Sequence, residues 1–228
     1  MEANIEIIDC EQGAPEWHQL RSGVITASMF SVFLDKLKTG KDKGGYKKAA
    51  HDYAFRLACE RIAGEPLDEG MFETWAMRRG KELESAARSE HALRICRDVD
   101  EAGFVRTSDG KFGASADGLI GEKGGAEYKC LIDPARLKSI IIDHDIDEFL
   151  PQVQACLWLT GRAWWHFVLY CPALEPAGKQ LTIFEVHRNE EYIENIEKEA
   201  LLFDDLVESY KGAILAHDDD INPASIKT

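Results

Sequence analysis

The sequence predicts a mixed α/β (α+β) domain with one central mixed sheet flanked by helices. Runs with helical periodicity come first and last, and runs with strand character fill the middle of the chain. The 228 residues are enough for one substantial core, so we expect a single domain over residues 1–228. A hydrophobic content of 45% with 30% charged residues is typical of a globular protein.

Three helices are expected in the first part of the chain. Thr26 or Ser28 can cap the first helix, and Gly64 followed by Pro66 ends the second. A loop rich in glycine and lysine lies between these two helices. The expected helices cover residues 26–37, 46–63 and 71–93.

The middle of the chain has the pattern of strands separated by turn residues. Adjacent side chains of a strand point to opposite faces, so we expect Trp164 and Trp165 on different faces of the sheet. His166 is expected to be a hydrogen-bonded sheet histidine rather than a ligand. The expected strands cover residues 95–106, 111–120, 126–131, 163–170 and 180–186.

Two further helices are expected in the second half of the chain. Gly161 ends the first of them, and the second is strongly acidic. A stretch rich in Ile and Asp before them is expected to be irregular, and the last residues to form a frayed tail. These segments are residues 132–148 (irregular), 149–160 and 189–215 (helices) and 216–228 (tail). The core of the domain is expected to cover about residues 17–187.

The turn over residues 121–125 (GEKGG) favours a β-hairpin. Residue 122 is midway between Asp117 and Glu127, so these carboxylates are expected to face each other, with Lys129 on the face of Glu127. Opposed carboxylates repel each other, and a divalent cation that prefers hard oxygen ligands, such as Mg²⁺, would remove the penalty. The alternative is a solvated hairpin with an ordinary ion pair, and the pattern alone is too loose to decide.

The net charge of −14 argues against a nucleic-acid partner when it is taken as a whole. The charge is unevenly distributed, however. Residues 189–220 contain eleven acidic and two basic residues, whereas residues 35–48 contain six lysines and two aspartates. The second segment could contact phosphates or form a solvated loop.

The six cysteines are scattered without a Cys-X-X-Cys pair, so neither a zinc site nor a disulfide framework is expected. The first residues are acidic and lack an apolar region, and no run approaches the length of a membrane span. We therefore expect a cytoplasmic protein without a membrane partner.

Several segments resemble the motifs of phage lambda exonuclease and the related YqaJ-type viral recombinases, the alkaline exonuclease family. They occur in the order and at nearly the spacing of that family. The motifs are WHQLRSGVITAS at 17–28, GKELESAAR at 80–88, SADGL at 115–119 with EYKC at 127–130, and QVQACLW at 152–158.

The resemblance implies a restriction-endonuclease-like PD-(D/E)XK core with a Mg²⁺ site, which Mn²⁺ could also occupy. Asp117 and Glu127 match the metal-binding carboxylates of the family, and the main-chain carbonyl of Tyr128 would be a further ligand. Lys129 matches the lysine that positions or activates the attacking water.

Two more residues complete the implied catalytic set. Glu84 matches a helix carboxylate near the metals, and the alternative for this residue is an i,i+4 ion pair with Arg88. Gln152 matches a glutamine that lines the site, and helical periodicity places it nearer the inward face than Gln154.

The resemblance also implies a pocket for a 5′-phosphate, formed by Arg21, Ser28 and Ser115. A guanidinium fork with hydroxyl groups suits this task. The alternatives are a surface ion pair for Arg21 and an N-cap for Ser28. A further phosphate-binding arginine of the family falls on Ala135 by ungapped counting, so its neighbour Arg136 is the candidate.

Two other positions complete the comparison with the family. Lys38 matches a basic residue that contacts DNA. Thr107 stands where the family has another acidic residue upstream of the metal ligands, and Asp109 is the alternative carboxylate.

The implied function is that of a Mg²⁺-dependent 5′-to-3′ exodeoxyribonuclease, a hydrolase that releases 5′-mononucleotides from 5′-phosphorylated ends of double-stranded DNA. The remaining 3′ overhang would serve recombination by single-strand annealing. The family also implies a homotrimeric ring around the DNA, a single-strand annealing protein as partner, and a phage or prophage protein in the bacterial cytoplasm. The acidic C-terminal helix would then lie away from the DNA.

Two alternatives remain at this point. One is another nuclease on the same core, such as a site-specific endonuclease or a repair nuclease, although iron–sulfur relatives need clustered cysteines. The other is a catalytically silent DNA-binding module, against which the set of Asp117, Glu127 and Lys129 argues.

Overall fold

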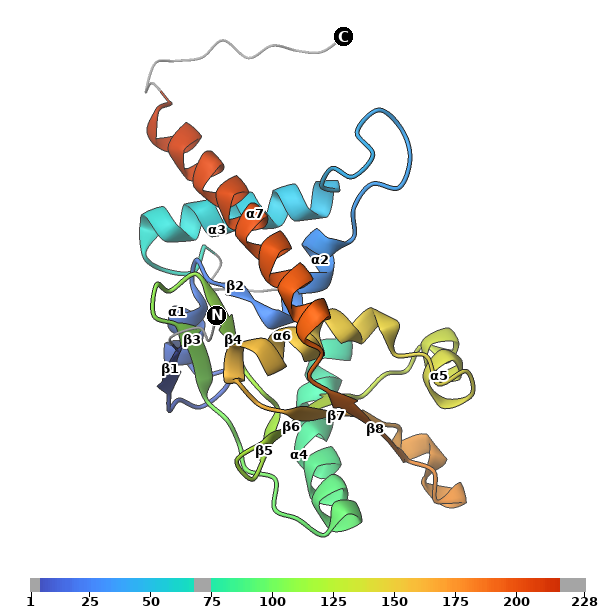
Figure 1. Ribbon diagram of the computed structural model, residues 1–228. Helices are drawn as coiled ribbons and strands as arrows, with labels where there is room; N and C mark the ends of the chain where they lie inside the picture. Colours follow the sequence, from blue (N-terminus) through green and yellow to red (C-terminus); the bar gives the residue numbers. More distant parts are fainter. Residues whose placement is uncertain (1–4, 68–74, 218–228) are drawn as a thin grey trace.

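The computed structural model describes residues 5–67 and 75–217, in which the strands form two mixed four-stranded sheets (Figure 1). The first sheet has the order β1-β3-β4-β2 and the second β5-β6-β7-β8. The strands are β1 (Ile5–Ile8), β2 (Ile25–Thr26), β3 (Phe104–Thr107), β4 (Phe112–Ala114), β5 (Gly118–Ile120), β6 (Gly124–Lys129), β7 (Trp164–Tyr170) and β8 (Leu181–His187).

Helices precede, separate and follow strands β3–β8, as the sequence predicts, whereas β1 and β2 lie among the first helices. Within the described ranges, no helix is both long and apolar enough to span a bilayer. The helices are α1 (Pro15–Arg21), α2 (Phe30–Leu34), α3 (Lys48–Ala63), α4 (Trp75–Ile95), α5 (Pro134–Ile141), α6 (Leu150–Thr160) and α7 (Glu190–Leu215), with 3₁₀ segments at Ala27–Met29, Asp147–Phe149 and Pro172–Ala177.

The mixed character of the sheet is confirmed, but the prediction of one central sheet is wrong. The strand expected over residues 111–120 breaks at residues 115–117, because β4 pairs with β3 and β2 whereas β5 pairs with β6. The side chain of Gln12 supports the break, since its Nε2 donates to the carbonyl oxygens of Ala116 (2.7 Å) and Ala102 (2.8 Å). Residues 115–117 therefore connect the two sheets.

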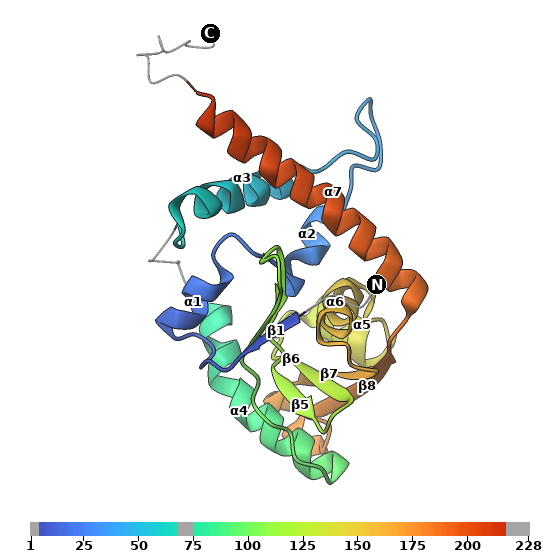
Figure 2. The ribbon, with the colours of Figure 1, turned by 60° about the vertical axis from the view of Figure 1, so that its left-hand side comes forward.

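Helices cover both faces of the second sheet (Figure 2). Phe167 and Leu169 of β7 belong to the hydrophobic cluster that contains the buried face of α6. Val168 and Tyr170 belong to a second cluster, together with Ala87 of α4. A sheet covered on both faces leaves its inner strands, β6 and β7, almost without contact to water.

The two tryptophans of β7 lie on opposite faces, as predicted. Each faces a glycine of β6, because Gly124 pairs with Trp164 and Gly125 with Trp165. A Cβ atom on Gly125 would lie 2.2 Å from Cζ3 of the fully buried Trp165. These glycines therefore allow the indole rings to lie across β6 and fix its position.

His166 is hydrogen-bonded within the fold, as predicted. Its Nδ1 lies 2.9 Å from Nε2 of His91 on α4, and Nδ1 of His91 lies 2.9 Å from the hydroxyl of Tyr128. Burial and, to a smaller extent, the nearby His166 lower the pKa of His91 to about 4. This neutral imidazole pair links α4 to β6 and β7.

The long helix α7 crosses α3 and also packs against α2 and α6 (Figures 1 and 2). Phe203 of α7 stacks on Phe33 of α2 and on Tyr53 of α3, with ring centroids 4.5 and 5.6 Å apart. The end of α3 is the predicted one, and a side chain caps the start of α7. Gly64 ends α3 in the left-handed conformation at φ 73°, and the Asn189 side chain accepts a hydrogen bond from the N–H of Tyr192 at 3.0 Å.

Four other local predictions need correction. The helix expected over 26–37 ends at Leu34 and starts in a 3₁₀ turn, and Thr26 makes no capping bond with its side chain. The strand expected over 95–106 is shorter, and the irregular stretch 132–148 contains α5, which Asp133 caps. Strand β1 and helix α1 are additional elements. The start of the helix expected at 71–93 lies outside the described residues.

Replacing Gly125 with Ala should lower the free energy of unfolding by about 1–3 kcal/mol, because the new methyl group collides with buried Trp165. Gly212→Ala is the matched control, since Gly212 is exposed on α7 with no atom within 4 Å of the added Cβ. That change should raise stability by up to about 1 kcal/mol through helix propensity. Urea unfolding measures both, and equal stability of the two variants would contradict this packing.

Candidate active site

The predicted hairpin is present with the predicted register. Gly118 pairs with Ala126, so Asp117 lies opposite Glu127. Oδ2 of Asp117 accepts a hydrogen bond from the N–H of Tyr128 at 2.7 Å. Glu127 is buried on the central strand β6, whereas Asp117 is half-buried just before β5.

Glu127, Lys129 and Gln152 form a closed triangle of polar contacts. Nζ of Lys129 donates to Oε1 of Glu127 at 2.6 Å and to Oε1 of Gln152 at 3.1 Å. Nε2 of Gln152 donates to the same Oε1 of Glu127 at 2.6 Å. Helix α6 thus presents Gln152 to the strand that carries the other two residues, while Gln154 points away and bonds to the carbonyl of His187.

The second oxygen of the Glu127 carboxylate has no hydrogen-bond donor within the described part of the chain, although it is buried. A buried carboxylate oxygen without a donor is costly. Burial raises the pKa of Asp117 well above its usual range, and the charges of Glu127 and Glu84 raise it further. Negative charge therefore accumulates at this position without enough positive charge to balance it.

Glu84 belongs to the same electrostatic group. Burial raises the pKa of this residue, Arg88 opposes the shift, and Glu127 reinforces it. The ion pair considered as the alternative is present, because Nη2 of Arg88 lies 2.8 Å from Glu84. Glu84 and Trp17 both line a cleft of about 970 Å³ between α4 and the N-terminal segment.

Lys129 remains an ammonium ion in this environment. Burial alone would lower the pKa of Lys129, but the charges of Glu127 and Asp117 outweigh burial, and the pKa is raised. A lysine in this state donates hydrogen bonds and cannot accept a proton. Its chemical use is to orient an oxygen and to balance negative charge.

The donor set fits a divalent cation. Asp117 and Glu127 offer oxygen atoms with unbalanced charge, and Mg²⁺ in proteins needs only one or two carboxylates because it retains several waters. In residues 5–67 and 75–217, no three His, Cys, Asp or Glu side chains converge into a complete metal cage. The remaining ligands would have to be water and main-chain oxygen, for which Tyr128 is the predicted source.

Arg21, Trp17 and Ser115 form a second group next to this one. The hydroxyl oxygen of Ser115 accepts hydrogen bonds from Nε1 of Trp17 (2.8 Å) and Nη1 of Arg21 (3.5 Å). A hydroxyl has two acceptor lone pairs and one proton. These two donors therefore leave the Ser115 proton free for an oxygen of a ligand.

Arg21 keeps its charge in this group. Its guanidinium lies 4.1 Å from the ring centroid of Trp17. Burial lowers the pKa of Arg21 to about 10, which still leaves a full positive charge at neutral pH. Among the described residues its contacts are with an indole and a hydroxyl rather than with a carboxylate, so the charge is available to an anion.

The other predicted residues lie further out. Ser28 is exposed, and its hydroxyl contacts Thr26 at 3.4 Å. Arg136 forms an ion pair with Glu148 and lies over the ring of Phe149, which Lys129 also faces. It is thus at the edge of the triangle formed by Glu127, Lys129 and Gln152.

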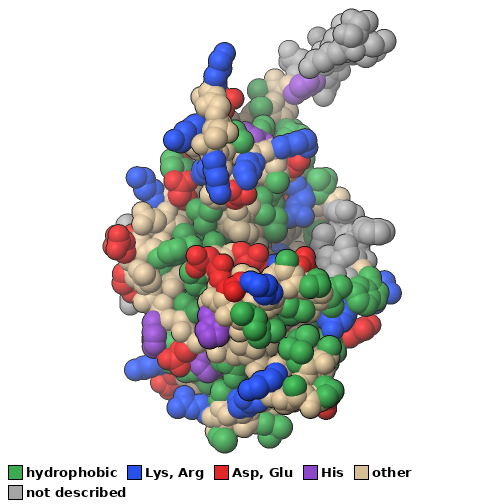
Figure 3. Space-filling view, turned by 90° about the vertical axis from the view of Figure 1, so that its right-hand side faces the viewer, with side chains coloured by type: hydrophobic (Ala, Val, Ile, Leu, Met, Phe, Trp, Pro, Cys, Tyr) green, Lys and Arg blue, Asp and Glu red, His purple; other side chains and the backbone are tan. Residues whose placement is uncertain are grey.

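Lys38 is exposed in the loop between α2 and α3. Figure 3 shows that basic side chains gather around this projecting loop at the top of the face. The loop is therefore a positively charged projection on an otherwise acidic molecule.

Asp109 does not supply a further carboxylate to the site. It accepts hydrogen bonds from Thr107 (2.6 Å) and from the N–H of Lys111 (3.1 Å) in the turn between β3 and β4. The connector that carries Asp117 lies at the opposite end of β4. Asp109 therefore stabilises a turn.

Trp17 is the residue whose local role the sequence did not indicate. It lies one helical turn before Arg21 on α1, which begins with Pro15 at its first position. Proline there is a start signal for a helix. Once the helix is recognised, the i,i+4 spacing places the indole beside the guanidinium.

Comparisons with known proteins agree with this geometry. Residues 16–163 match the family model described as the YqaJ-like viral recombinase domain. A comparison with curated proteins gives no match.

Three solved structures are similar to this chain. An alkaline exonuclease (LHK-Exo) from Laribacter hongkongensis shares 28% identity, with a TM-score of 0.74 and coverage of 89% of this chain and 96% of that one. The structure of LHK-Exo in complex with dAMP shares 29% identity, with a TM-score of 0.76 and coverage of 88% of this chain and 96% of that one. A phage-related exonuclease from Haemophilus somnus 129PT, at 17% identity, shares the fold, with a TM-score of 0.60 and coverage of 85% and 95%.

Replacing Gln152 with Ala should lower the rate of phosphodiester cleavage by about 10- to 100-fold, because hydrogen bonds to charged groups contribute about 1.5–3 kcal/mol. Gln154→Ala is the control on the same helix. It loses the contacts to His187 and Asn189 and should lower the unfolding temperature with little change in the rate. If Gln154→Ala slowed cleavage as strongly as Gln152→Ala, the triangle would not be the reacting centre.

Proposed function

Since the chain belongs to the YqaJ-like viral recombinase family, we propose that it is a Mg²⁺-dependent exonuclease that degrades one strand of duplex DNA from the 5′ end. The observation that supports this most directly is the short separation of two groups along the chain. Ser115, in contact with Arg21, is two residues before Asp117 on the connector between the sheets. An anion pocket and a carboxylate pair are therefore held next to each other.

The cation is expected at Asp117, Glu127 and the carbonyl oxygen of Tyr128. When it is bound, Mg²⁺ neutralises charge on the phosphate and makes water a stronger nucleophile. The Lys129 ammonium can hold the attacking oxygen, because Glu127 and Gln152 fix its position on two sides. Its raised pKa assigns orientation and charge balance to this lysine rather than proton removal.

The Arg21 and Ser115 group determines where cleavage occurs. A terminal 5′-phosphate would accept hydrogen bonds from the guanidinium and from the free proton of Ser115. The neighbouring carboxylate pair would then act on the next phosphodiester bond, so each cycle releases one 5′-mononucleotide. Repeated cycles leave a 3′ overhang.

The rest of the DNA needs contacts outside this pocket. Lys38 is exposed on the basic loop, and a lysine there would contact backbone phosphates. Arg136 could join the phosphate group if its pair with Glu148 opens, and Ser28 could add a hydroxyl. The family also suggests a homotrimeric ring, in which enclosure replaces a broad positive face, and a single-strand annealing protein that binds the overhang.

Purified protein should digest linear duplexes with 5′-phosphate ends in Mg²⁺ and leave covalently closed circles intact. Lys129→Ala should lower the rate by about 10²–10³-fold, the usual effect of removing a preorganised charge or donor. Lys123→Ala is the matched control, because Lys123 is exposed in the turn of the same hairpin. Gel analysis of strands labelled at the 3′ end shows which strand is lost.

Each outcome separates one part of the proposal. Cleavage of closed circles would indicate an endonuclease. Digestion in EDTA would exclude the metal requirement, and equal digestion by Lys129→Ala would remove the assigned role of the lysine. Indifference to the 5′-phosphate would exclude the Arg21 and Ser115 pocket.

A further inference from the structure

The backbone of Gly23, two residues after Arg21, is held by two adjacent side chains of α3. The N–H of Gly23 donates to Oε2 of Glu60 at 2.8 Å, and its carbonyl accepts from Nε of Arg61 at 2.8 Å. Gly23 has φ 70°, and a Cβ there would lie 2.8 Å from Cγ of Arg61. Glycine is thus required for this close approach, and the position of the chain after α1 is fixed by α3.

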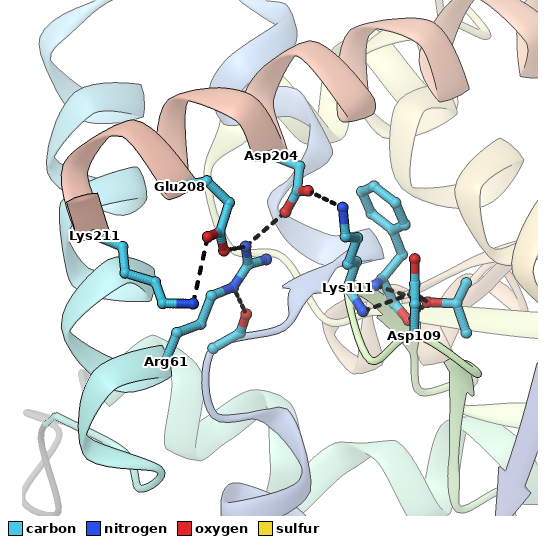
Figure 4. A network of polar contacts seen from close by, with 9 residues as sticks. Arg61, Asp109, Lys111, Asp204, Glu208 and Lys211 are labelled. Atoms are coloured by element: carbon cyan, nitrogen blue, oxygen red, sulfur yellow. Dashed lines mark hydrogen bonds and ion pairs between the residues drawn. The ribbon is translucent and has the colours of Figure 1, made fainter.

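Arg61 is itself held by the acidic helix α7 (Figure 4). Its Nη1 lies 2.7 Å from Oδ1 of Asp204, at an angle that gives an ion pair rather than an aligned hydrogen bond, and 2.8 Å from Oε1 of Glu208. The Asp204 side chain is only 2% exposed, whereas that of Glu208 is 45% exposed. The buried carboxylate is therefore the less screened of the two partners.

The other oxygen of Asp204 holds the strand that leads to Ser115. Nζ of Lys111 donates to Oδ2 of Asp204 at 2.6 Å. The carbonyl of Lys111 accepts a hydrogen bond from the N–H of Ile25 at 2.9 Å, next to the parallel pairing of β2 with β4. Strand β4 runs from this point to the connector residues 115–117.

We propose that Asp204 is a positioning residue for the 5′-phosphate pocket, an inference that rests on the proposed function. One oxygen acts through Arg61 and Gly23 on the segment that carries Arg21. The other acts through Lys111 and β4 on the connector that carries Ser115.

A neutral side chain at position 204 would leave Arg61 and Lys111 close together without a buried anion between them. Two like charges so placed separate, and the two halves of the pocket shift relative to each other. If α7 only had to pack on α3, an apolar residue at position 204 would stabilise the contact equally well, because a buried ion pair adds little to stability over well-packed hydrophobic residues. The buried carboxylate is therefore explained better by positioning than by packing.

The test compares Asp204→Asn with Asp205→Asn, its exposed neighbour on the same helix. For each protein, kcat/KM is measured in Mg²⁺ on duplexes that differ only in a 5′-phosphate or 5′-hydroxyl end. Asp204→Asn should reduce the preference for the phosphate by at least about fivefold, with a smaller loss of rate on the hydroxyl end because Asp117 lies on the same connector. Asp205→Asn should keep the wild-type preference.

Arg61→Gln should show the same selective loss and serves if Asp204→Asn does not fold. A lower unfolding temperature with an unchanged preference would reduce Asp204 to a packing role and overturn the proposal. The failure of the proposed function gives a different result, because the wild-type protein would then show no exonuclease activity or no preference for the phosphate. If the wild-type protein prefers the 5′-phosphate end and the variants show the same preference, the positioning role of Asp204 is overturned and the proposed function stands.

Discussion

The carboxylate of Glu127 is the constraint on which the rest of the structure depends. It is buried on the central strand of the second sheet, with Asp117 and Glu84 nearby and with Lys129 as its side-chain cation. Both Lys129 and Gln152 bind one of its oxygens, and the other has no donor in the described residues. Such an arrangement is costly until something outside the protein completes it, and a divalent cation has the charge and ligand preference to do so. Helices α4 and α6 cover the two faces of β6, and its glycines pack against the two tryptophans of β7. This burial keeps water away from the Glu127 carboxylate, so that its charge is weakly screened.

The break between the two sheets brings the group around Arg21 and Ser115 next to the carboxylates. Had residues 111–120 formed one strand, Ser115 and Asp117 would lie in a regular ladder of a single sheet. The connector instead places a hydroxyl close to Arg21 and a carboxylate opposite Glu127 within three residues. The proposed phosphate pocket and the carboxylate pair are thereby coupled by covalent geometry. The buried contacts of Asp204 extend this coupling to α3 and α7.

Local signals predicted those parts of the fold that local interactions determine. The turn at residues 121–125 predicted the register of the hairpin, and Gly64 predicted the end of α3. The two-sheet architecture was missed because it depends on Gln12, about a hundred residues away from the carbonyl it binds. The grouping of Arg21 with Ser115 came from resemblance to a family rather than from spacing. Glu60, Arg61 and Asp204 were not singled out, since contacts between distant helices leave no periodic pattern.

The central claim is that the unpartnered Glu127 oxygen belongs to a cation site, and thermal unfolding with and without Mg²⁺ tests it most directly. A ligand that binds only the folded state raises stability with concentration. We predict that Mg²⁺ raises the unfolding temperature of the wild-type protein and leaves that of Glu127→Gln unchanged, while Glu127→Gln without Mg²⁺ is at least as stable as the wild type because one buried charge is removed. The same Mg²⁺ shift in both proteins, or no shift in the wild type, would contradict the account.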